Sequence, residues 1–289
     1  MTLVVAVSGG IDSVVLLHML CKGQEEGEKG EEHYVVAHVD HGIRDDSRDD
    51  AIFVERLAVH YGLQYESTQL RLGARASEES ARDARYRFLN EVKNRYKAEA
   101  IVTAHHQDDV LETMIINLIR GTGWRGLCSL REHGEMRRPL LAMSKAEIIQ
   151  YALVHGLAWR DDSTNDDPRY LRNYVRQTLL RGVSPVERQA LLRLYHDQVA
   201  IASEVEVELA RLVELAGAGD GLRRYWLIMV GQSMAGELIS AWQQQRFETQ
   251  SLRRLWHFAC TARPGKKIVE SGRVFVVTAR DLIVSSPHI

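Results

Sequence analysis

The sequence predicts an α/β fold, a doubly wound and mostly parallel sheet, followed by a smaller, mainly helical domain that ends in a β-hairpin. Short apolar runs rich in Val and Ile alternate with helix-like stretches over the first 120 residues. This alternation is typical of a parallel sheet that is covered on both faces. After about residue 185 the pattern changes to long helical stretches and then to strands. We therefore expect domains at residues 1–184 and 185–289.

The elements of the first domain follow from the period of the apolar residues. Strands are expected at residues 3–7, 34–39, 65–70 and 100–104, and helices at residues 13–19, 49–61, 77–96 and 109–120. The last helix places Leu111, Ile115 and Leu118 on one side, which is helical spacing. Residues 22–32 are rich in Gly, Glu and Lys without periodicity, so a surface loop is expected there.

The second domain is expected to begin with one long helix or two, over residues 185–215. The glycine cluster at 217–221 would break it, and two or three shorter helices should follow within residues 222–259. Strand patterns occupy residues 267–270, 274–278 and 282–284. Pro264 and Gly265 precede them, and Gly272 lies between the first two. They predict the closing hairpin.

The net charge of -2, from 37 basic and 39 acidic residues, suggests at first that the partner is not a polyanion. The charges are unevenly distributed, however. Residues 120–193 hold 13 basic and 8 acidic side chains, and residues 223–280 hold 10 and 3. A nucleic acid that bound these two segments would meet a basic surface, so the balanced total does not exclude such a partner.

Three widely spaced cysteines, without a Cys-x-x-Cys pair, argue against a disulfide framework and against a four-thiolate metal site. This usage fits a reducing compartment. No apolar run approaches the ~18 residues of a membrane helix. The first residues also lack the pattern of a signal peptide. We therefore expect a cytoplasmic protein without a membrane segment.

A glycine turn joins the first predicted strand to the first predicted helix. Its residues are Ser8, Gly9, Gly10, Ile11, Asp12 and Ser13. Glycines allow an anion to approach the backbone, and free N–H groups at a helix start bind phosphate. Asp12 would repel a bare phosphate, which suggests a bridging Mg²⁺ ion. The turn lacks the Lys of Gly-x-x-x-x-Gly-Lys, which argues against a γ-phosphate-splitting NTPase. A plain helix-capping turn remains an alternative.

A second group of polar residues follows the fourth predicted strand. Asp109 and Glu112 are three apart on a helix and so share a face, with His105 beside them. Two carboxylates suit a cationic amine, and they can help to remove its proton before attack. Two alternatives stay open. The acids could complement the helix dipole, or His105, His106 and Asp109 could bind a metal, although no fourth ligand is evident.

Two sets of arginines complete the candidate residues. Arg82 and Arg85 lie three apart on one predicted helix, where they could bind phosphates or form an ordinary charged surface. Arg172 and Arg176 also share a helical face and have Asn173 between them. Together with neighbouring tyrosines they could bind unpaired bases, although an amphipathic helix face would look the same.

The turn resembles the pyrophosphate loop of the N-type ATP pyrophosphatases, the PP-loop superfamily, which split ATP between the α and β phosphates. Within that superfamily, further segments resemble the tRNA(Ile)-lysidine synthetases. These segments are HVDHGIR at 38–44, ARDARY at 81–86, TAHHQDDVLET at 103–113, RGTGWRGL at 120–127, RPLL at 138–141, and DSTN at 162–165 with Arg172, Asn173 and Arg176. The resemblance weakens beyond about residue 185.

The resemblance implies an adenine nucleotide α hydrolase-like fold and a ligase that forms a carbon–nitrogen bond. ATP would adenylate the wobble cytidine of an isoleucine tRNA with a CAU anticodon, and free lysine would then attack C2 to form lysidine, with release of pyrophosphate and AMP. Longer members carry a further C-terminal domain, so this chain would be a short form, in which residues 185–289 contact the tRNA. A dimer is possible. The alternatives are a tRNA thiolase, which usually has cysteine pairs, and a non-catalytic tRNA-binding homologue.

The resemblance also assigns roles to individual residues. The residues expected to bind ATP are Ser8, Gly9, Gly10, Ile11, Asp12, Ser13, Asp40, His41 and Arg82, with Mg²⁺ held by Asp12 through ATP. Lysine is expected to bind to Asp109 and Glu112, and the residues expected to take part in catalysis are Asp12, Arg85, His105, Asp109 and Glu112. The residues expected to bind tRNA are Arg172, Asn173 and Arg176.

Overall fold

The computed structural model describes residues 1–26, 32–40, 47–70, 78–160, 171–218 and 220–285. The chain divides into two compact units, Met1–Gln198 and Val199–Ile289. The division falls inside one continuous helix, α8 (Pro185–Ala216). The functional boundary predicted between residues 184 and 185 stays a prediction, and the two units are described separately below.

The first unit contains a five-stranded sheet in the order β3-β2-β1-β4-β5, in which every pair of neighbours is parallel. Its strands are β1 (Thr2–Ala6), β2 (His33–Asp40), β3 (Gln64–Gln69), β4 (Ala100–Val102) and β5 (Met136–Arg137). Val5 of β1 pairs with Val36 of β2 and with Val102 of β4. The parallel sheet predicted from the apolar runs is confirmed, with the short edge strand β5 as an addition.

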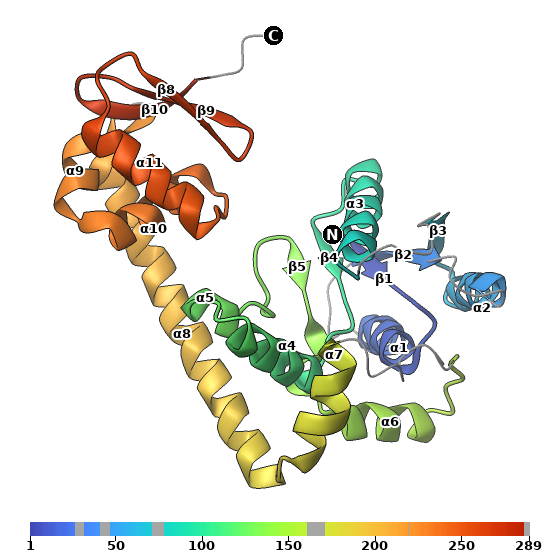
Figure 1. The fold of residues 1–289 in the computed structure, drawn as a ribbon. Helices are drawn as coiled ribbons and strands as arrows, with labels where there is room; N and C mark the ends of the chain where they lie inside the picture. Colours follow the sequence, from blue (N-terminus) through green and yellow to red (C-terminus); the bar gives the residue numbers. More distant parts are fainter. Residues whose placement is uncertain (27–31, 41–46, 71–77, 161–170, 219, 286–289) are drawn as a thin grey trace. The chain divides into compact units, whose positions relative to one another are not determined.

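Helices cover both faces of this sheet, as a doubly wound fold requires. On one face, Leu3 and Val5 pack with residues of α1 (Ile11–Glu25), α2 (Ser47–His60) and α6 (Lys145–Val154). On the other face, Val4 packs with Leu89 and Val92 of α3 (Glu78–Arg95). Figure 1 shows α1 and α3 on opposite sides of the sheet. The predicted fold class is therefore confirmed.

Helix α1 is longer than predicted, since it continues through Glu25 into the segment expected to be a loop. Gly23 is buried inside the helix, and the Lys22 ammonium lies 3.6 Å from the Glu26 carboxylate one turn further on. The packing of Gly23 and the ion pair of Lys22 with Glu26 stabilise a helix in a segment whose composition alone indicated a loop.

The remainder of the first unit surrounds α4 (Gln107–Ile119). It comprises α5 (Trp124–Leu127), the 3₁₀ turn Pro139–Ala142, α7 (Leu171–Tyr174), the π-helical turn Val175–Leu179, the 3₁₀ turn Leu180–Gly182 and the start of α8. Buried Leu111 of α4 packs with Val175 and Leu180. This apolar contact places the segment after residue 170 against α4.

Within its described residues, the second unit combines the end of α8 and three further helices with a five-stranded antiparallel sheet of order β6-β7-β10-β9-β8. Its elements are the end of α8, β6 (Gly217–Ala218), β7 (Gly221–Arg223), α9 (Arg224–Met229), α10 (Gly231–Gln243), α11 (Thr249–Thr261), β8 (Lys267–Glu270), β9 (Arg273–Val277) and β10 (Asp281–Ser285). The predicted closing strands are β8, β9 and β10. The glycine cluster adds the two strands β6 and β7. Gly221 packs so closely against β10 that a Cβ on it would lie only 2.6 Å from the Leu282 carbonyl oxygen. Within the described residues, no helix has the length and apolar character needed to cross a membrane.

Candidate active site

The glycine turn at residues 8–13, called the phosphate loop below, connects β1 to the first turn of α1. Gly9 has a φ of 96°, in the region that favours glycine. The Ser13 hydroxyl oxygen accepts hydrogen bonds from the N–H groups of Ser8 and Gly9, both at 3.2 Å, and it donates to the Gly10 carbonyl at 2.8 Å. Gly10 is the N-cap of α1 and has no side chain with which to cap the helix. The loop is therefore held in shape from within, with the helix N-terminus beside it.

Asp12, in the first turn of α1, is approached by two other elements. The Lys145 Nζ atom lies 2.5 Å from Asp12 Oδ1, and the His106 Nε2 atom lies 3.8 Å from the same oxygen. Sequence reasoning did not single out Lys145. The capping pattern of Ser144 and Glu147 could have indicated that a helix begins at Lys145, but not that this helix starts beside the phosphate loop.

Asp12 fits the predicted role in holding Mg²⁺. This ion keeps several waters and takes phosphate oxygens as ligands, so that one protein carboxylate can suffice. Asp12 is part of the loop and its side chain is 31% exposed, which makes its carboxylate accessible to a nucleotide-bound ion. Among the residues described, no group of three or more His, Cys, Asp or Glu side chains could hold a metal, so the alternative of a metal centre at His105, His106 and Asp109 gains no support.

The first turn of α4 is closed by reciprocal hydrogen bonds. The His106 ring nitrogen Nδ1 accepts from the Asp108 N–H at 3.2 Å, and the His106 N–H donates to Asp109 Oδ2 at 3.0 Å. Asp109 therefore caps the helix with one oxygen, in line with the dipole interpretation. Its other oxygen, Oδ1, lies 2.8 Å from the Arg172 Nη2 atom. Burial acts to raise the pKa of Asp109, but His106 and Arg172 outweigh it and lower that pKa.

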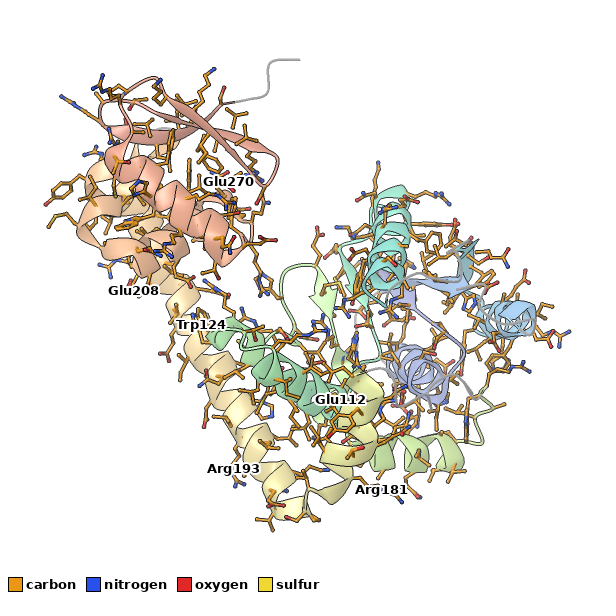
Figure 2. All side chains as sticks on the ribbon, viewed as in Figure 1. Glu112, Trp124, Arg181, Arg193, Glu208 and Glu270 are labelled. Carbon is orange, nitrogen blue, oxygen red and sulfur yellow. The ribbon has the colours of Figure 1, made fainter. Side chains whose placement is uncertain are left out.

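Glu112, one turn further along α4, has a side chain that is only 1% exposed. Arg172 Nε donates to its Oε2 atom at 2.8 Å, and Arg176 Nε donates to its Oε1 atom at 2.5 Å. Figure 2 labels Glu112 where α4 meets α7. A carboxylate this deeply buried needs such partners, because an unpaired buried charge is very costly. The structure therefore brings two residues predicted to bind tRNA onto two residues predicted to bind lysine.

Arg172 and Arg176 differ in exposure. The Arg172 side chain is 26% exposed and bridges both carboxylates, whereas the Arg176 side chain is 41% exposed. Burial opposes the charge on each guanidinium, but Asp109 and Glu112 raise the pKa of both arginines. Asn173, between them, is buried. The expected binding of tRNA by these three residues stays a prediction.

His105, at the carboxyl end of β4, is held by Thr103, whose Oγ1 atom lies 2.8 Å from His105 Nδ1. Burial lowers the pKa of His105 to about 3; Asp109 acts in the opposite direction, while Arg138, Arg172 and Arg85 lower it further. The ring is therefore neutral near pH 7. The effect of Arg85 on this pKa also places that arginine within electrostatic reach of His105.

Arg82 and Arg85 both contact Tyr86 on α3. The guanidinium carbons lie 5.0 Å and 5.6 Å from the centre of the Tyr86 ring. Arg82 is exposed and Arg85 partly buried. The tyrosine thus limits the positions of two cations that otherwise have long, flexible side chains.

Asp40 ends β2 at the same edge of the sheet as the phosphate loop and is buried, with Gln69 Nε2 donating to its Oδ2 at 3.0 Å. His41, its predicted partner in ATP binding, lies outside the described residues, as do the motif residues at 162–165. His38 is structural: its Nδ1 atom lies 2.9 Å from the Val7 carbonyl oxygen.

Comparisons with known proteins agree with this geometry. The PP-loop domain family matches residues 1–183. A tRNA(Ile)-lysidine synthase of a Thermotoga species is 36% identical over 220 residues, 73% of this chain and 52% of that protein. The enzyme of the same name from Geobacter sulfurreducens is 36% identical over 261 residues, 87% of this chain and 52% of that protein. The chain thus spans about half the length of the curated relatives it matches.

A solved structure is similar in fold. The U34-tRNA thiolase NcsA from Methanococcus maripaludis, with its [4Fe-4S] cluster, superposes with a TM-score of 0.53 at 18% identity and covers 68% of this chain and 72% of its own. At that identity the likeness concerns the fold alone. The matched domain and the loop geometry lead to one conclusion: this chain belongs to the PP-loop family, and its similarity to proteins named tRNA(Ile)-lysidine synthase confirms the resemblance seen in its motifs.

Proposed function

We propose that this protein joins free lysine to C2 of the wobble cytidine of an isoleucine tRNA with a CAU anticodon. ATP first adenylates the cytidine O2 atom with loss of pyrophosphate, and lysine then displaces AMP. The observation that carries the proposal is the position of His106, whose Nε2 atom lies 3.8 Å from Asp12 and 3.5 Å from Asp109. It joins the phosphate loop to the paired carboxylates, which supports a nucleotide site beside a cation site.

The first step needs positive charge around the triphosphate, because the bond from Pα to the bridging oxygen breaks and the electron pair leaves with pyrophosphate. The N-terminus of α1 would supply backbone N–H groups, and the proposal assigns guanidinium groups to this step from Arg82 and Arg85. A Mg²⁺ ion held by Asp12 would neutralise charge on the departing group. The proposed ATP site also includes Asp40 and His41, because both belong to the motif at residues 38–44 that resembles the family.

The second step needs lysine with an unprotonated amine, since an ammonium of pKa ~10.4 is not nucleophilic. Asp109 and Glu112 orient the amine, and their carboxylates help to remove its proton before the carbon–nitrogen bond forms, with His105 beside them. Both Glu112 oxygens already accept hydrogen bonds from Arg172 and Arg176. Lysine can therefore reach Glu112 only if an arginine moves from it, for example toward the phosphates of the bound tRNA.

The proposed tRNA contact of residues 185–289 rests on charge. Residues 223–280 carry 10 basic and 3 acidic side chains. In the second unit, Arg253 on α11 and Lys267 on β8 are exposed, whereas Arg254 is paired with Glu270. Exposed basic side chains suit contact with a phosphate backbone.

The experiment gives the purified 289-residue protein ATP, Mg²⁺, labelled lysine and a transcript of the tRNA with a CAU anticodon. We expect labelled lysine in the tRNA and equal amounts of AMP and pyrophosphate, with loss of all products when the tRNA is omitted. A transcript with cytidine replaced by uridine at the wobble position is the matched control and should receive no lysine.

The alternatives give different outcomes in the same assay. A tRNA thiolase would release AMP and incorporate sulfur only with a sulfur donor, and a non-catalytic binder would release neither AMP nor pyrophosphate. Either result, with no lysine in the tRNA, would contradict the proposal. The thiolase is the less favoured alternative because Cys21 and Cys128 are buried and separated by more than a hundred residues in the sequence.

A further inference from the structure

The phosphate loop has no lysine of its own, but the structure supplies one from a distant part of the chain. Lys145 is the first residue of α6, and its Nζ atom lies 2.5 Å from Asp12 Oδ1, 133 positions away in the sequence. In the Gly-x-x-x-x-Gly-Lys loop a lysine at the start of a helix reaches the phosphates. Lys145 brings the same chemical group to the same kind of loop.

The backbone of Lys145 is held from both sides. Ser144 caps α6, its N–H donating to Glu147 Oε2 at 2.7 Å and the Glu147 N–H donating back to Ser144 Oγ at 3.3 Å. Just before it, the Met143 carbonyl accepts from the Gln107 N–H at 2.9 Å, which ties the segment to the first turn of α4. Ile148 of α6 is fully buried in the core that includes α1. The backbone of Lys145 is therefore held in place, and the Lys145 ammonium can change position only by rotation of the side chain.

Stability does not account for the pair of Lys145 and Asp12. Their side chains are 37% and 31% exposed, and ion pairs in contact with solvent contribute little to folding. The pair does place a cation at the point where negative charge gathers. Once a Mg²⁺ ion takes Asp12 as a ligand, the Lys145 ammonium, with three N–H donors, becomes available to phosphate oxygens.

We propose that Lys145 is a phosphate-binding residue of this site and binds the pyrophosphate portion of ATP. The inference rests on the proposed function, because it assumes that ATP occupies the loop. In the adenylation step the bond between Pα and the bridging oxygen breaks, and Lys145 balances the charge on the pyrophosphate without transferring a proton. Asp12 holds Lys145 in position until the nucleotide arrives.

The test measures binding by titration calorimetry, with inorganic pyrophosphate, ATP and AMP as separate ligands in the presence of Mg²⁺. Lys145→Met should weaken binding of pyrophosphate and of ATP about tenfold to a hundredfold, the value of a hydrogen bond to a charged group. It should leave AMP binding within about twofold of wild type. Lys145→Arg should restore most of the affinity, since it keeps the charge. Lys22→Met, at the other end of α1, is the matched control and should bind as wild type does.

The outcomes separate the inference from the proposed function. A Lys145→Met protein that binds pyrophosphate and ATP as wild type does would overturn the inference alone. Equal losses for pyrophosphate, ATP and AMP would also overturn it, because they would indicate a damaged loop. A wild-type protein that binds neither ATP nor pyrophosphate would overturn both. Circular dichroism melting of each variant establishes that it is folded at the temperature of the titration.

Discussion

Arg172 Nε lies 2.8 Å from Glu112 Oε2, and the pair joins α7 to a carboxylate that is almost inaccessible to water. Residues in this arrangement depend on each other, because loss of one partner removes part of the compensation for the other charge. The same contact therefore bears on stability and on access to the proposed lysine site.

Removing the carboxylate should destabilise the first unit. We expect Glu112→Ala to lower the free energy of unfolding by about 3 kcal/mol, because Arg176 loses its nearest carboxylate and Arg172 keeps only Asp109. Urea unfolding measures this loss. Glu208→Ala, which breaks the exposed contact of Glu208 with Arg211 on α8, is the control and should change little. Equal effects of the two substitutions would contradict the structural role of Glu112.

Milder substitutions should separate lysine binding from ATP binding. Glu112→Gln and Asp109→Asn keep the shape of each side chain but remove its charge. We expect each to raise the KM for lysine about tenfold or more, the value of a hydrogen bond between charged groups, with the affinity for ATP nearly unchanged. Steady-state lysine incorporation and ATP titration give the two values. An unchanged KM for lysine in both variants would remove these residues from the lysine site.

The neutral state of His105 predicts a dependence of stability on pH. Burial lowers the pKa of His105 to about 3, against about 6.5 in the unfolded chain. Below pH 6.5 the unfolded state therefore binds a proton that the folded state does not, so stability falls as the pH decreases. Between pH 7 and pH 5.5 this contributes a loss of about 1 kcal/mol, which His105→Gln should abolish. Urea unfolding at both pH values checks this, with a His257→Gln variant, at an exposed position of α11, as the control. Equal pH dependence in all three proteins would contradict the result.

The sequence predicted the structure correctly where neighbouring residues determine the local conformation. The apolar runs of β1, β2 and β4 predicted a parallel sheet because such strands are buried on both faces. The spacing of Asp109 and Glu112 predicted that they share one face of α4, and both point toward the same arginines. Local pattern also predicted the phosphate loop before α1, where Gly9 has its positive φ.

Contacts between distant segments could not be predicted in this way. Arg172 lies 60 positions from Glu112, and Lys145 lies 133 positions from Asp12. A basic stretch looks the same in sequence whether it faces solvent, RNA or a buried carboxylate, since its charge pattern does not specify its partner. The two strands β6 and β7 were missed for a related reason: glycines usually break strands, and only contact with Leu282 explains why Gly221 lies in one.

The basic residues of the second unit predict salt-dependent binding of tRNA. Each phosphate contact releases about one counterion, so the affinity should fall as the salt concentration rises. We expect Arg253→Glu and Lys267→Glu each to reduce the slope of log Kd against log salt by about 1. Filter binding over a range of salt concentrations measures it. Lys97→Glu, after α3 in the first unit, is the control and should keep the wild-type slope. Binding that is independent of salt would contradict the electrostatic account.

Two adjacent glycines test the shape of the phosphate loop. At Gly9, φ is 96° and a Cβ would lie 3.4 Å from Val54 Cγ2, whereas Gly10 has a φ of -71° and its Cβ would lie 3.5 Å from Ser8 Oγ. Gly9→Ala should therefore cost about 1–2 kcal/mol of stability, or move the loop so that ATP binds more weakly. Gly10→Ala, in a conformation open to any residue, should cost less in both respects. Urea unfolding and ATP titration measure the two effects. A loop in which Gly10→Ala is the more damaging substitution would not have the conformation seen here, because the left-handed backbone at Gly9 is what turns the chain from β1 into α1.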